Sequence, residues 1–175
     1  YRLDKPWSRN TDFFEGKTVA NDFGEYILIE ENFKETYRTG KIYLNELLEI
    51  EPEVFSQLSV KNPISNLNLE KTIFLDIETT GLSGGSGTYP FLIGIGFFQD
   101  GRFCLKQFFM PDYSREKAML FDLTKLLQDY EFLVTFNGKG YDLPILNGRF
   151  ILQRIKTVFD VQTHLDLLFP SRRFW

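Results

Sequence analysis

Two carboxylates interrupt an apolar run in residues 74–81, Phe-Leu-Asp-Ile-Glu-Thr-Thr-Gly, and this pattern constrains the fold more than any other. Successive side chains of a β-strand point to opposite faces, so Asp76 and Glu78 project together from the end of one strand. Two neighbouring like charges repel unless a cation or a shared proton compensates them. Carboxylate oxygens favour hard divalent cations. The pattern therefore predicts a buried strand that presents a Mg²⁺ or Mn²⁺ site at its end.

The size and composition of the chain are those of one globular domain with a sizeable core. The chain has 175 residues, of which 43% are hydrophobic and 25% charged. Aromatic residues make up 17% and include 19 phenylalanines. We expect most of these phenylalanines in the core, whereas a few could instead stack on nucleobases.

The charge of the chain narrows the range of partners. A net charge of −4 and a pI of about 5.1 exclude a generic electrostatic nucleic-acid binder. A metal-dependent nuclease remains compatible with this charge, because bound metal ions reverse the local field.

The single cysteine, Cys104, cannot form an intrachain disulfide and fits a reducing, cytoplasmic compartment. No apolar run approaches ~18 residues, so we expect no membrane-spanning helix.

The first 70 residues are expected to form an N-terminal extension of unknown role, followed by the main domain in residues 71–175. Residues 1–22 are polar and are expected to be irregular. A strand is predicted over Tyr26 to Ile29, and a strand that turns into a short helix over Ile42 to Ile50. The first residue is not Met and no signal peptide is evident. We therefore expect the chain to begin inside a longer protein.

The main domain begins with three predicted strands. They cover Thr72 to Ile77, Phe91 to Phe98 and Phe103 to Phe109, and Asp100-Gly101 between the last two is a hairpin signal. A glycine-rich loop separates the first two strands. It lacks the Lys-Ser/Thr pair of a phosphate-binding loop, and a strand rather than a helix follows it.

Alternating helices and strands are predicted for the rest of the domain. A helix that Ser114 can cap is followed by a strand over Phe132 to Phe136. A second helix begins near Leu143, and a last strand is expected over Thr157 to Val161. Two antiparallel steps followed by crossover units predict a mixed α/β sheet.

Asp142 is the third carboxylate of interest. It follows a buried strand and a glycine turn and precedes a helix, and ligands collect at strand ends in open α/β sheets. Taken alone, Asp142 is more readily explained as a helix-capping residue than as a metal ligand. Together with Asp76 and Glu78 it gives three carboxylates at the ends of adjacent core strands, which suits one or two hard cations.

Other charged residues give weaker signals. His164, the only histidine, lies two residues before Asp166, and we favour a structural or supporting role for it over an acid–base pair. Residues 143–175 contain five basic and two acidic side chains. Such a basic flank suits a phosphodiester substrate, although an ordinary mixed surface explains it equally well.

The motifs together resemble a known group of nucleases. Residues 76–82 resemble the first motif of the DEDD exonucleases, which have the RNase H-like fold, and residues 137–142 resemble their second motif, an Asn followed by an aromatic–Asp pair. More narrowly, residues 84–94, 135–146 and 164–168 resemble the bacterial YprB-type RNase H-like family. The resemblance implies an α/β RNase H-like fold, with three antiparallel strands followed by parallel strands and flanking helices.

The resemblance also implies roles for single residues. Asp76, Glu78 and Asp142 would ligate two Mg²⁺ or Mn²⁺ ions, one activating a water and the other stabilising the leaving 3′ oxygen. The residues expected against the terminal nucleotide are Thr80, Gly81 and Leu82, with Asn137 nearby.

The family pattern has a fourth carboxylate, on a helix after the last core strand. This chain ends at Trp175 before such a helix, and Asp166 comes too early and lacks the family spacing. We therefore expect a C-terminally truncated domain with three of four ligands, in which His164 and Asp166 support the ligands.

The main hypothesis is a metal-dependent 3′–5′ exonuclease that acts on single-stranded 3′ ends of DNA or RNA. An endonuclease of the RNase H type, which cuts RNA in a hybrid, is the first alternative, and product lengths distinguish the two. A non-catalytic nucleic-acid or protein-binding module with an incomplete metal site is the second alternative. Weak or absent Mn²⁺ binding that a C-terminal extension restores would favour a truncated nuclease over an inactive site.

Overall fold

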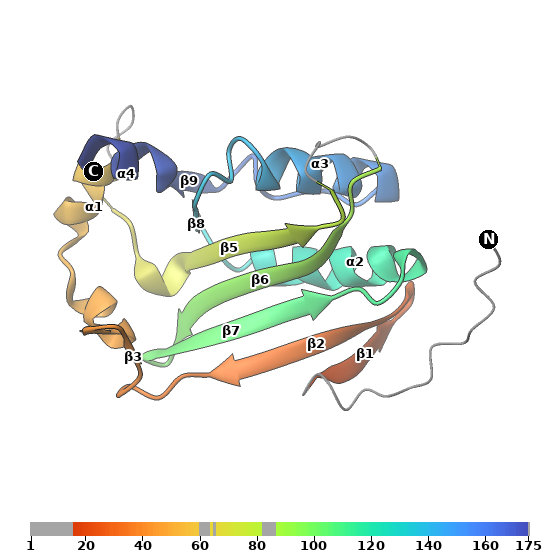
Figure 1. Cartoon of the computed structure of the whole chain (residues 1–175), viewed down its shortest axis with the longest axis horizontal. Coiled ribbons are helices and arrows are strands. Elements are labelled where there is room, and N and C mark those ends of the chain that lie inside the picture. The colour runs from red at the N-terminus through yellow and green to blue at the C-terminus, as the bar shows by residue number, and fades with distance from the viewer. Residues whose placement is uncertain (1–15, 60–63, 65, 82–86, 175) are drawn as a thin grey trace.

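The fold is built around one large β-sheet with helices packed on it (Figure 1). The structure, a computed structural model, describes residues 16–59, 64, 66–81 and 87–174. The strands are β1 (Lys17–Asn21), β2 (Gly24–Asn32), β3 (Arg38–Thr39), β4 (Ile42–Tyr43), β5 (Thr72–Thr79), β6 (Pro90–Gln99), β7 (Arg102–Phe109), β8 (Phe132–Thr135) and β9 (Thr163–Asp166). The helices are α1 (Pro52–Leu58), α2 (Glu116–Leu127), α3 (Asp142–Gln153) and α4 (Leu168–Phe174), with short 3-10 helices η2 (Leu44–Glu49), η3 (Leu69–Lys71) and η4 (Tyr113–Arg115).

The order and direction of the core strands are those expected for an RNase H-like fold. The large sheet has the order β1-β2-β7-β6-β5-β8-β9, while β3 and β4 form a separate two-stranded ladder. β5, β6 and β7 are antiparallel neighbours, and β8 and β9 continue the sheet in parallel. Asp100 and Gly101, both with positive φ, make the β6–β7 turn that the Asp-Gly pair predicts.

Helices α2 and α3 cover one face of the sheet. On the sides of these helices that face the sheet, Leu120, Leu123 and Leu146 are fully buried in the main core. On β5, Ile73, Leu75 and Ile77 point into this core, which leaves the intervening side chains of the strand on the other face.

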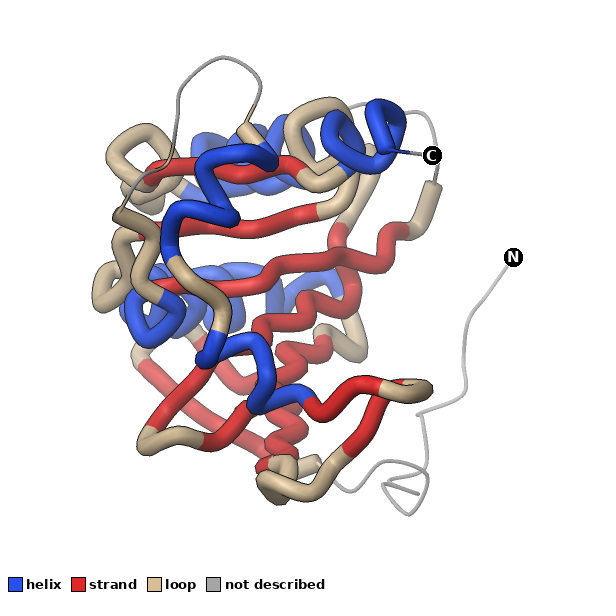
Figure 2. The backbone as a smooth tube through the Cα atoms, turned by 90° about the vertical axis from the view of Figure 1, so that its left-hand side faces the viewer, coloured by secondary structure: helices blue, strands red, loops and turns tan. Residues whose placement is uncertain are grey.

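The other face is covered at one end by the segment that precedes β5. Figure 2 shows this segment in front of the near ends of the strands. A second core cluster joins Phe55, Ile64, Leu67 and Leu69 of this segment to Phe98, Phe132, Val134 and Leu165 of the sheet. Asp76 and Glu78, further along β5, remain exposed.

Two N-terminal strands extend the sheet beyond the expected core. β2 pairs with β7 from Ile27–Phe109 to Asn32–Cys104, which confirms the strand predicted around Tyr26. The expectation of irregular structure for residues 1–22 is wrong for β1, which pairs with β2. The Asn21 side chain donates to the Ala118 carbonyl and to Asp122 on α2, contacts that leave no local sequence signal. The domain boundary near residue 70 stays a prediction.

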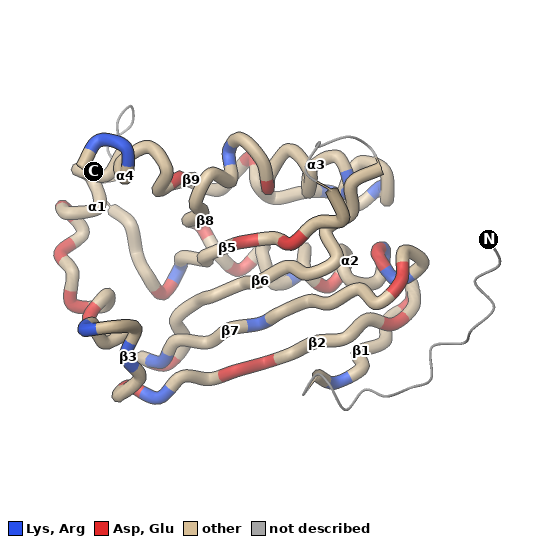
Figure 3. Tube along the Cα trace, viewed as in Figure 1, with Lys and Arg blue, Asp and Glu red and all other residues tan. Residues whose placement is uncertain are grey.

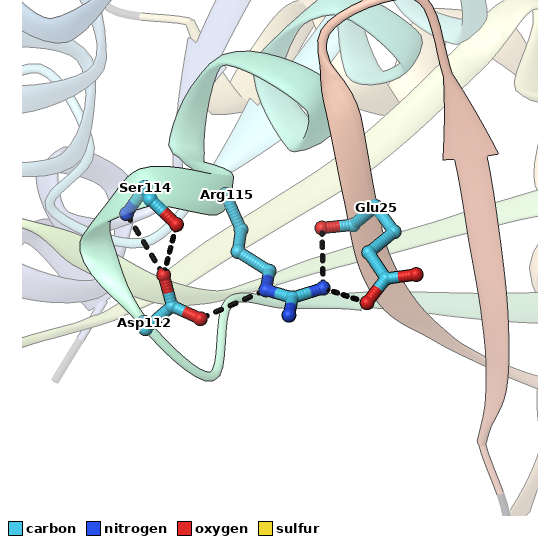
Figure 4. A network of polar contacts seen from close by, with 4 residues as sticks. All are labelled: Glu25, Asp112, Ser114 and Arg115. Carbon is cyan, nitrogen blue, oxygen red and sulfur yellow. Dashed lines mark hydrogen bonds and ion pairs between the residues drawn. The ribbon is translucent and has the colours of Figure 1, made fainter.

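Arg115 fastens β2 to the start of α2 (Figure 4). Its Nε donates to Asp112 at 2.8 Å, and its guanidinium pairs with the Glu25 carboxylate. Asp112 also accepts a hydrogen bond from the Ser114 backbone N–H at 3.0 Å. Asp112 therefore takes the capping role predicted for Ser114, because the 3-10 turn η4 precedes α2 and moves the cap upstream.

The last strand lies later than predicted. No strand forms over Thr157 to Val161, and β9 covers Thr163–Asp166 instead. The β-branched residues suggested a strand, but Val161 is 84% exposed. The Gln162 side chain donates to the carbonyls of Leu127 and Tyr130 and fixes a turn here. As a result, both His164 and Asp166 lie in β9.

Among the described residues, no helix has the length and apolar character to cross a bilayer.

Candidate active site

Asp76 and Glu78 lie on the open face near the end of β5. Both side chains are exposed, and their alternation with the buried Leu75 and Ile77 follows the pleat of the strand. Asp76 stands opposite Gly94 of β6, and the β5–β6 register becomes irregular between Glu78 and Thr79. The first motif therefore sits where regular pairing ends, with two accessible carboxylates on one face.

Asp142 begins α3 and is buried, with only 4% of its surface exposed. It does not cap the helix: Tyr141 occupies the N-cap position and makes no side-chain cap. Within the described part of the chain, the Asp142 carboxylate has no hydrogen-bond partner. A buried carboxylate without donors is unfavourable unless it is protonated or meets a cation.

Burial and nearby negative charge raise the pKa of Asp142 from its ordinary value of 3.8 to about 6. Burial is the largest cause, followed by the charges of Asp76 and Asp166. The two sequence motifs therefore meet in the fold, since Asp76 from β5 acts on Asp142 from α3. Figure 3 shows acidic positions along the later part of β5 and at the start of α3. In residues 16–59, 64, 66–81 and 87–174, however, no three acidic, His or Cys side chains lie close enough to enclose a metal ion.

Asp166 holds the loop that leads to Asp142. Its carboxylate accepts hydrogen bonds from the backbone N–H groups of Asn137 at 2.8 Å and Lys139 at 2.9 Å. It also accepts from the N–H of Leu168 at 3.0 Å, at the start of α4. Asp166 is 3% exposed. These three bonds join the end of β9 to the β8–α3 loop.

His164 lies behind this loop and contacts β8. Its Nε2 is 2.8 Å from the Thr135 hydroxyl. Burial and the nearby Lys139 lower the pKa of His164 to about 4, against the opposing effect of Asp166. The imidazole is therefore neutral at physiological pH.

The residues predicted to contact substrate form the end of β5 and the β8–α3 loop. Thr80 pairs with Tyr89 through its N–H and accepts a bond from the Tyr89 N–H at its hydroxyl. The Gly81 carbonyl accepts hydrogen bonds from the hydroxyls of Thr79 and Tyr141. Asn137 has a positive φ of 66° and begins the loop. Leu82 lies outside the described residues.

Sequence reasoning missed the contribution of Tyr141. The Tyr141 hydroxyl is 2.7 Å from Thr79 Oγ1 and 2.9 Å from the Gly81 carbonyl oxygen, so it links the two motifs directly. Its position before Asp142 was visible as the aromatic residue of the second motif. The partners of its hydroxyl lie about 60 residues away along the chain, and no local pattern announces them.

Arg149, counted in the basic flank, is not on the surface. It is 5% exposed, and its Nε and Nη2 donate to the fully buried Glu116 carboxylate at 2.5 and 2.6 Å. Its guanidinium also lies 3.8 Å from the centre of the Tyr89 ring. This ion pair joins α2, α3 and the residues after the glycine-rich loop. The exposed members of the flank are Arg154, Lys156, Arg172 and Arg173.

A groove of about 480 Å³ opens on the sheet face that carries Asp76. The residues that line it include Gly94, Gly96, Phe74 and Phe103. None of the described residues that line it is Lys or Arg. Its surface therefore suits flat apolar groups better than phosphates.

Comparisons with known proteins agree with this architecture. A sequence profile of the RNase H superfamily matches residues 73–174. The uncharacterized protein YprB of Bacillus subtilis is 33% identical over 155 residues, which cover 86% of this chain and 37% of YprB. DNA polymerase 1 of Aeropyrum pernix is 49% identical over 37 residues, 21% of this chain and 4% of the polymerase. The chain thus spans little more than a third of the length of YprB.

Proposed function

The chain belongs to the RNase H superfamily, and from this membership we propose that it is a metal-dependent nuclease, specifically a 3′–5′ exonuclease on DNA or RNA. The observation that carries the proposal is Asp142, a buried residue whose carboxylate accepts no hydrogen bond from the described residues and is affected by the charge of the exposed Asp76. A divalent cation compensates such a pair of charges. The nuclease-like fold supports the general reaction class, phosphodiester hydrolysis.

Asp76, Glu78 and Asp142 would hold Mg²⁺ or Mn²⁺, in a two-metal site of the complete protein. All three offer only oxygen donors, which match these ions. When bound, such ions lower the pKa of a coordinated water and stabilise charge on a leaving oxygen. Asp142 also has to lose its proton to act as a ligand, so acid should weaken metal binding.

The remaining site residues would bind and orient the nucleic acid. Thr80, Gly81 and Leu82 would lie against the terminal nucleotide, and Asn137 near it. Lys139 is exposed on the same loop as Asn137 and offers a positive charge to a phosphate. His164 and Asp166 would act behind this loop, since their contacts are with protein groups.

A single-stranded substrate fits the charge distribution best. The net charge of −4 disfavours binding of an extended duplex through its phosphates. The apolar groove beside Asp76 suits the faces of unpaired bases.

Cys104 is buried and forms no disulfide, which is compatible with a reducing, cytoplasmic setting.

The test is hydrolysis of end-labelled single-stranded DNA and RNA with Mn²⁺, with Asp76→Ala as the inactive variant. The exposed Asp160, which lies in a turn and is none of the predicted site residues, supplies a matched control as Asp160→Asn. A ladder that shortens by single nucleotides from the 3′ end supports the proposal. Internal cuts, tested also on an RNA–DNA hybrid, would indicate the endonuclease. If the chain without substitutions binds single-stranded DNA or RNA but does not cleave it, a nucleic-acid-binding module is indicated.

A further inference from the structure

The end of β5 lacks regular pairing on the side that faces β8. The β5–β8 ladder comprises only Thr72–Phe132, Ile73–Leu133 and Phe74–Val134. Beyond Phe74, β5 continues for five residues that carry Asp76 and Glu78. On its other side, the pairing with β6 becomes irregular after Glu78. The strand end that bears the first motif therefore needs another tie to keep its place relative to the second motif.

Tyr141 supplies such a tie. Three contacts connect its hydroxyl, the Thr79 hydroxyl and the Gly81 carbonyl: Tyr141–Thr79 at 2.7 Å, Tyr141–Gly81 at 2.9 Å and Thr79–Gly81 at 2.9 Å. Each hydroxyl has one proton to donate, so two protons serve three contacts. Both hydroxyls can donate to the carbonyl, or one hydroxyl can donate to the other, which then donates to the carbonyl. Each arrangement keeps Tyr141 joined to the end of β5.

Asp142 depends on this tie more than a typical ligand does. Its carboxylate has no hydrogen-bond donor among the described residues, so no hydrogen bond from them fixes its orientation. Its placement rests on the backbone of its neighbour Tyr141 and of the loop before it. Asp166 secures the beginning of that loop through Asn137 and Lys139. Tyr141 secures its end.

We propose that the Tyr141 hydroxyl is a positioning group that sets Asp142 relative to Asp76 and Glu78 for metal binding. This inference rests on the proposed function, since it concerns the same carboxylates. The Tyr141 ring, half-buried against the main core, anchors the side chain, and the hydroxyl provides the directional link to β5. Groups that orient metal ligands typically change metal affinity or activity by about 10- to 100-fold when removed.

The decisive variant is Tyr141→Phe, which keeps the ring and removes only the hydroxyl. We expect Mn²⁺ affinity, measured by calorimetry, and kcat to fall by about 10- to 100-fold, while KM for a single-stranded substrate changes little. Thr79→Val should act in the same direction, and Thr79→Ser should retain the parent values. The double variant Tyr141→Phe/Thr79→Val should be little worse than the more impaired single variant, because both remove one interaction.

Tyr130→Phe is the matched control. Tyr130 is also half-buried, packs near Phe97 and precedes β8, at the opposite end of that strand from the loop. We expect its Mn²⁺ affinity and kcat to equal those of the parent protein. Parent-like Mn²⁺ affinity and kcat in Tyr141→Phe would overturn the proposal, as would an equal loss in Tyr130→Phe.

Amide NMR of the metal-free protein separates this inference from the proposed function. Tyr141→Phe should shift the resonances of residues 79–81, and Thr79→Val should shift those of residues 141–143. If the parent protein neither binds Mn²⁺ nor cleaves nucleic acid, the proposed function fails, and these shifts alone decide whether the tie exists. Unchanged resonances at residues 79–81 in Tyr141→Phe would then refute it.

Discussion

Replacing Asp142 by Asn should stabilise the metal-free protein at neutral pH. Most substitutions of buried residues destabilise, so the predicted sign is unusual. Asp142 is 4% exposed as a residue, its carboxylate has no hydrogen-bond donor among the described residues, and the charges of Asp76 and Asp166 act on it. An amide of similar size removes the negative charge and both repulsions. The free energy of unfolding should therefore rise, while metal binding is lost.

The size of the gain follows from the pKa of Asp142. That pKa rises from 3.8 to about 6 on folding. At about 1.4 kcal/mol per tenfold change in proton affinity, the ionised form is destabilised by about 3 kcal/mol in the folded protein. The folded state binds the extra proton between pH 3.8 and 6, so this group's contribution to stability falls as pH rises through that window. The gain in Asp142→Asn should be complete above about pH 7 and absent near pH 3.8.

Urea unfolding in the presence of EDTA, at pH 7.5 and near pH 4.5, measures both the gain and its pH dependence. His164 also titrates, with a pKa lowered to about 4, so the difference between variant and parent is the quantity to compare. Asp160→Asn, at an exposed turn position, should change the free energy of unfolding by less than about 0.5 kcal/mol. A variant as stable as the parent at pH 7.5, or less stable, would refute the reasoning. So would a gain that does not shrink in acid.

Three further substitutions test other parts of the structure. Glu116→Ala leaves the Arg149 guanidinium without its buried carboxylate. The free energy of unfolding, measured by urea titration, should fall by about 3–5 kcal/mol. A loss below about 1 kcal/mol would contradict a buried ion pair. Asp166→Ala removes the acceptor of three backbone N–H groups and should lower the free energy of unfolding by about 1–3 kcal/mol. Amide hydrogen exchange at residues 137–139 should become faster. Unchanged exchange there would contradict the role of Asp166 in holding the β8–α3 loop. Lys139→Ala should change the free energy of unfolding by less than about 0.5 kcal/mol. It should weaken the binding of single-stranded DNA, measured by fluorescence anisotropy, and reduce the salt dependence of that binding. An unaltered salt dependence would exclude a phosphate contact.

The prediction of the core fold succeeded where local patterns are strong. The apolar run predicted a strand over Thr72 to Ile77, which β5 confirms, and the alternation of strand side chains predicted the common face of Asp76 and Glu78. The Asp-Gly pair predicted the β6–β7 turn, and the expected cap at Ser114 predicted a helix close to the start of α2. Each of these signals comes from residues a few positions apart, whose geometry the backbone itself dictates.

The prediction failed where distant contacts override local preference. β9 formed at Thr163–Asp166 rather than at the β-branched residues before it, because pairing with β8 determines its position. Arg149 looked like a surface cation, but Glu116, 33 residues earlier, holds it in the core. Charge and hydropathy of a single position cannot reveal such a partner.

The sequence alone determined the identity of the three carboxylates and the strand that carries two of them, because strand pleat and motif spacing are local properties. The meeting of Asp142 with Asp76 was expected from strand order, but its consequences were decided by tertiary structure. Burial and the charges of Asp76 and Asp166 raise the pKa of Asp142, and the Tyr141 hydroxyl contacts the end of β5, about 60 residues away in sequence. Both effects arise from groups brought together only by packing, since desolvation and hydrogen bonding depend on distance in space.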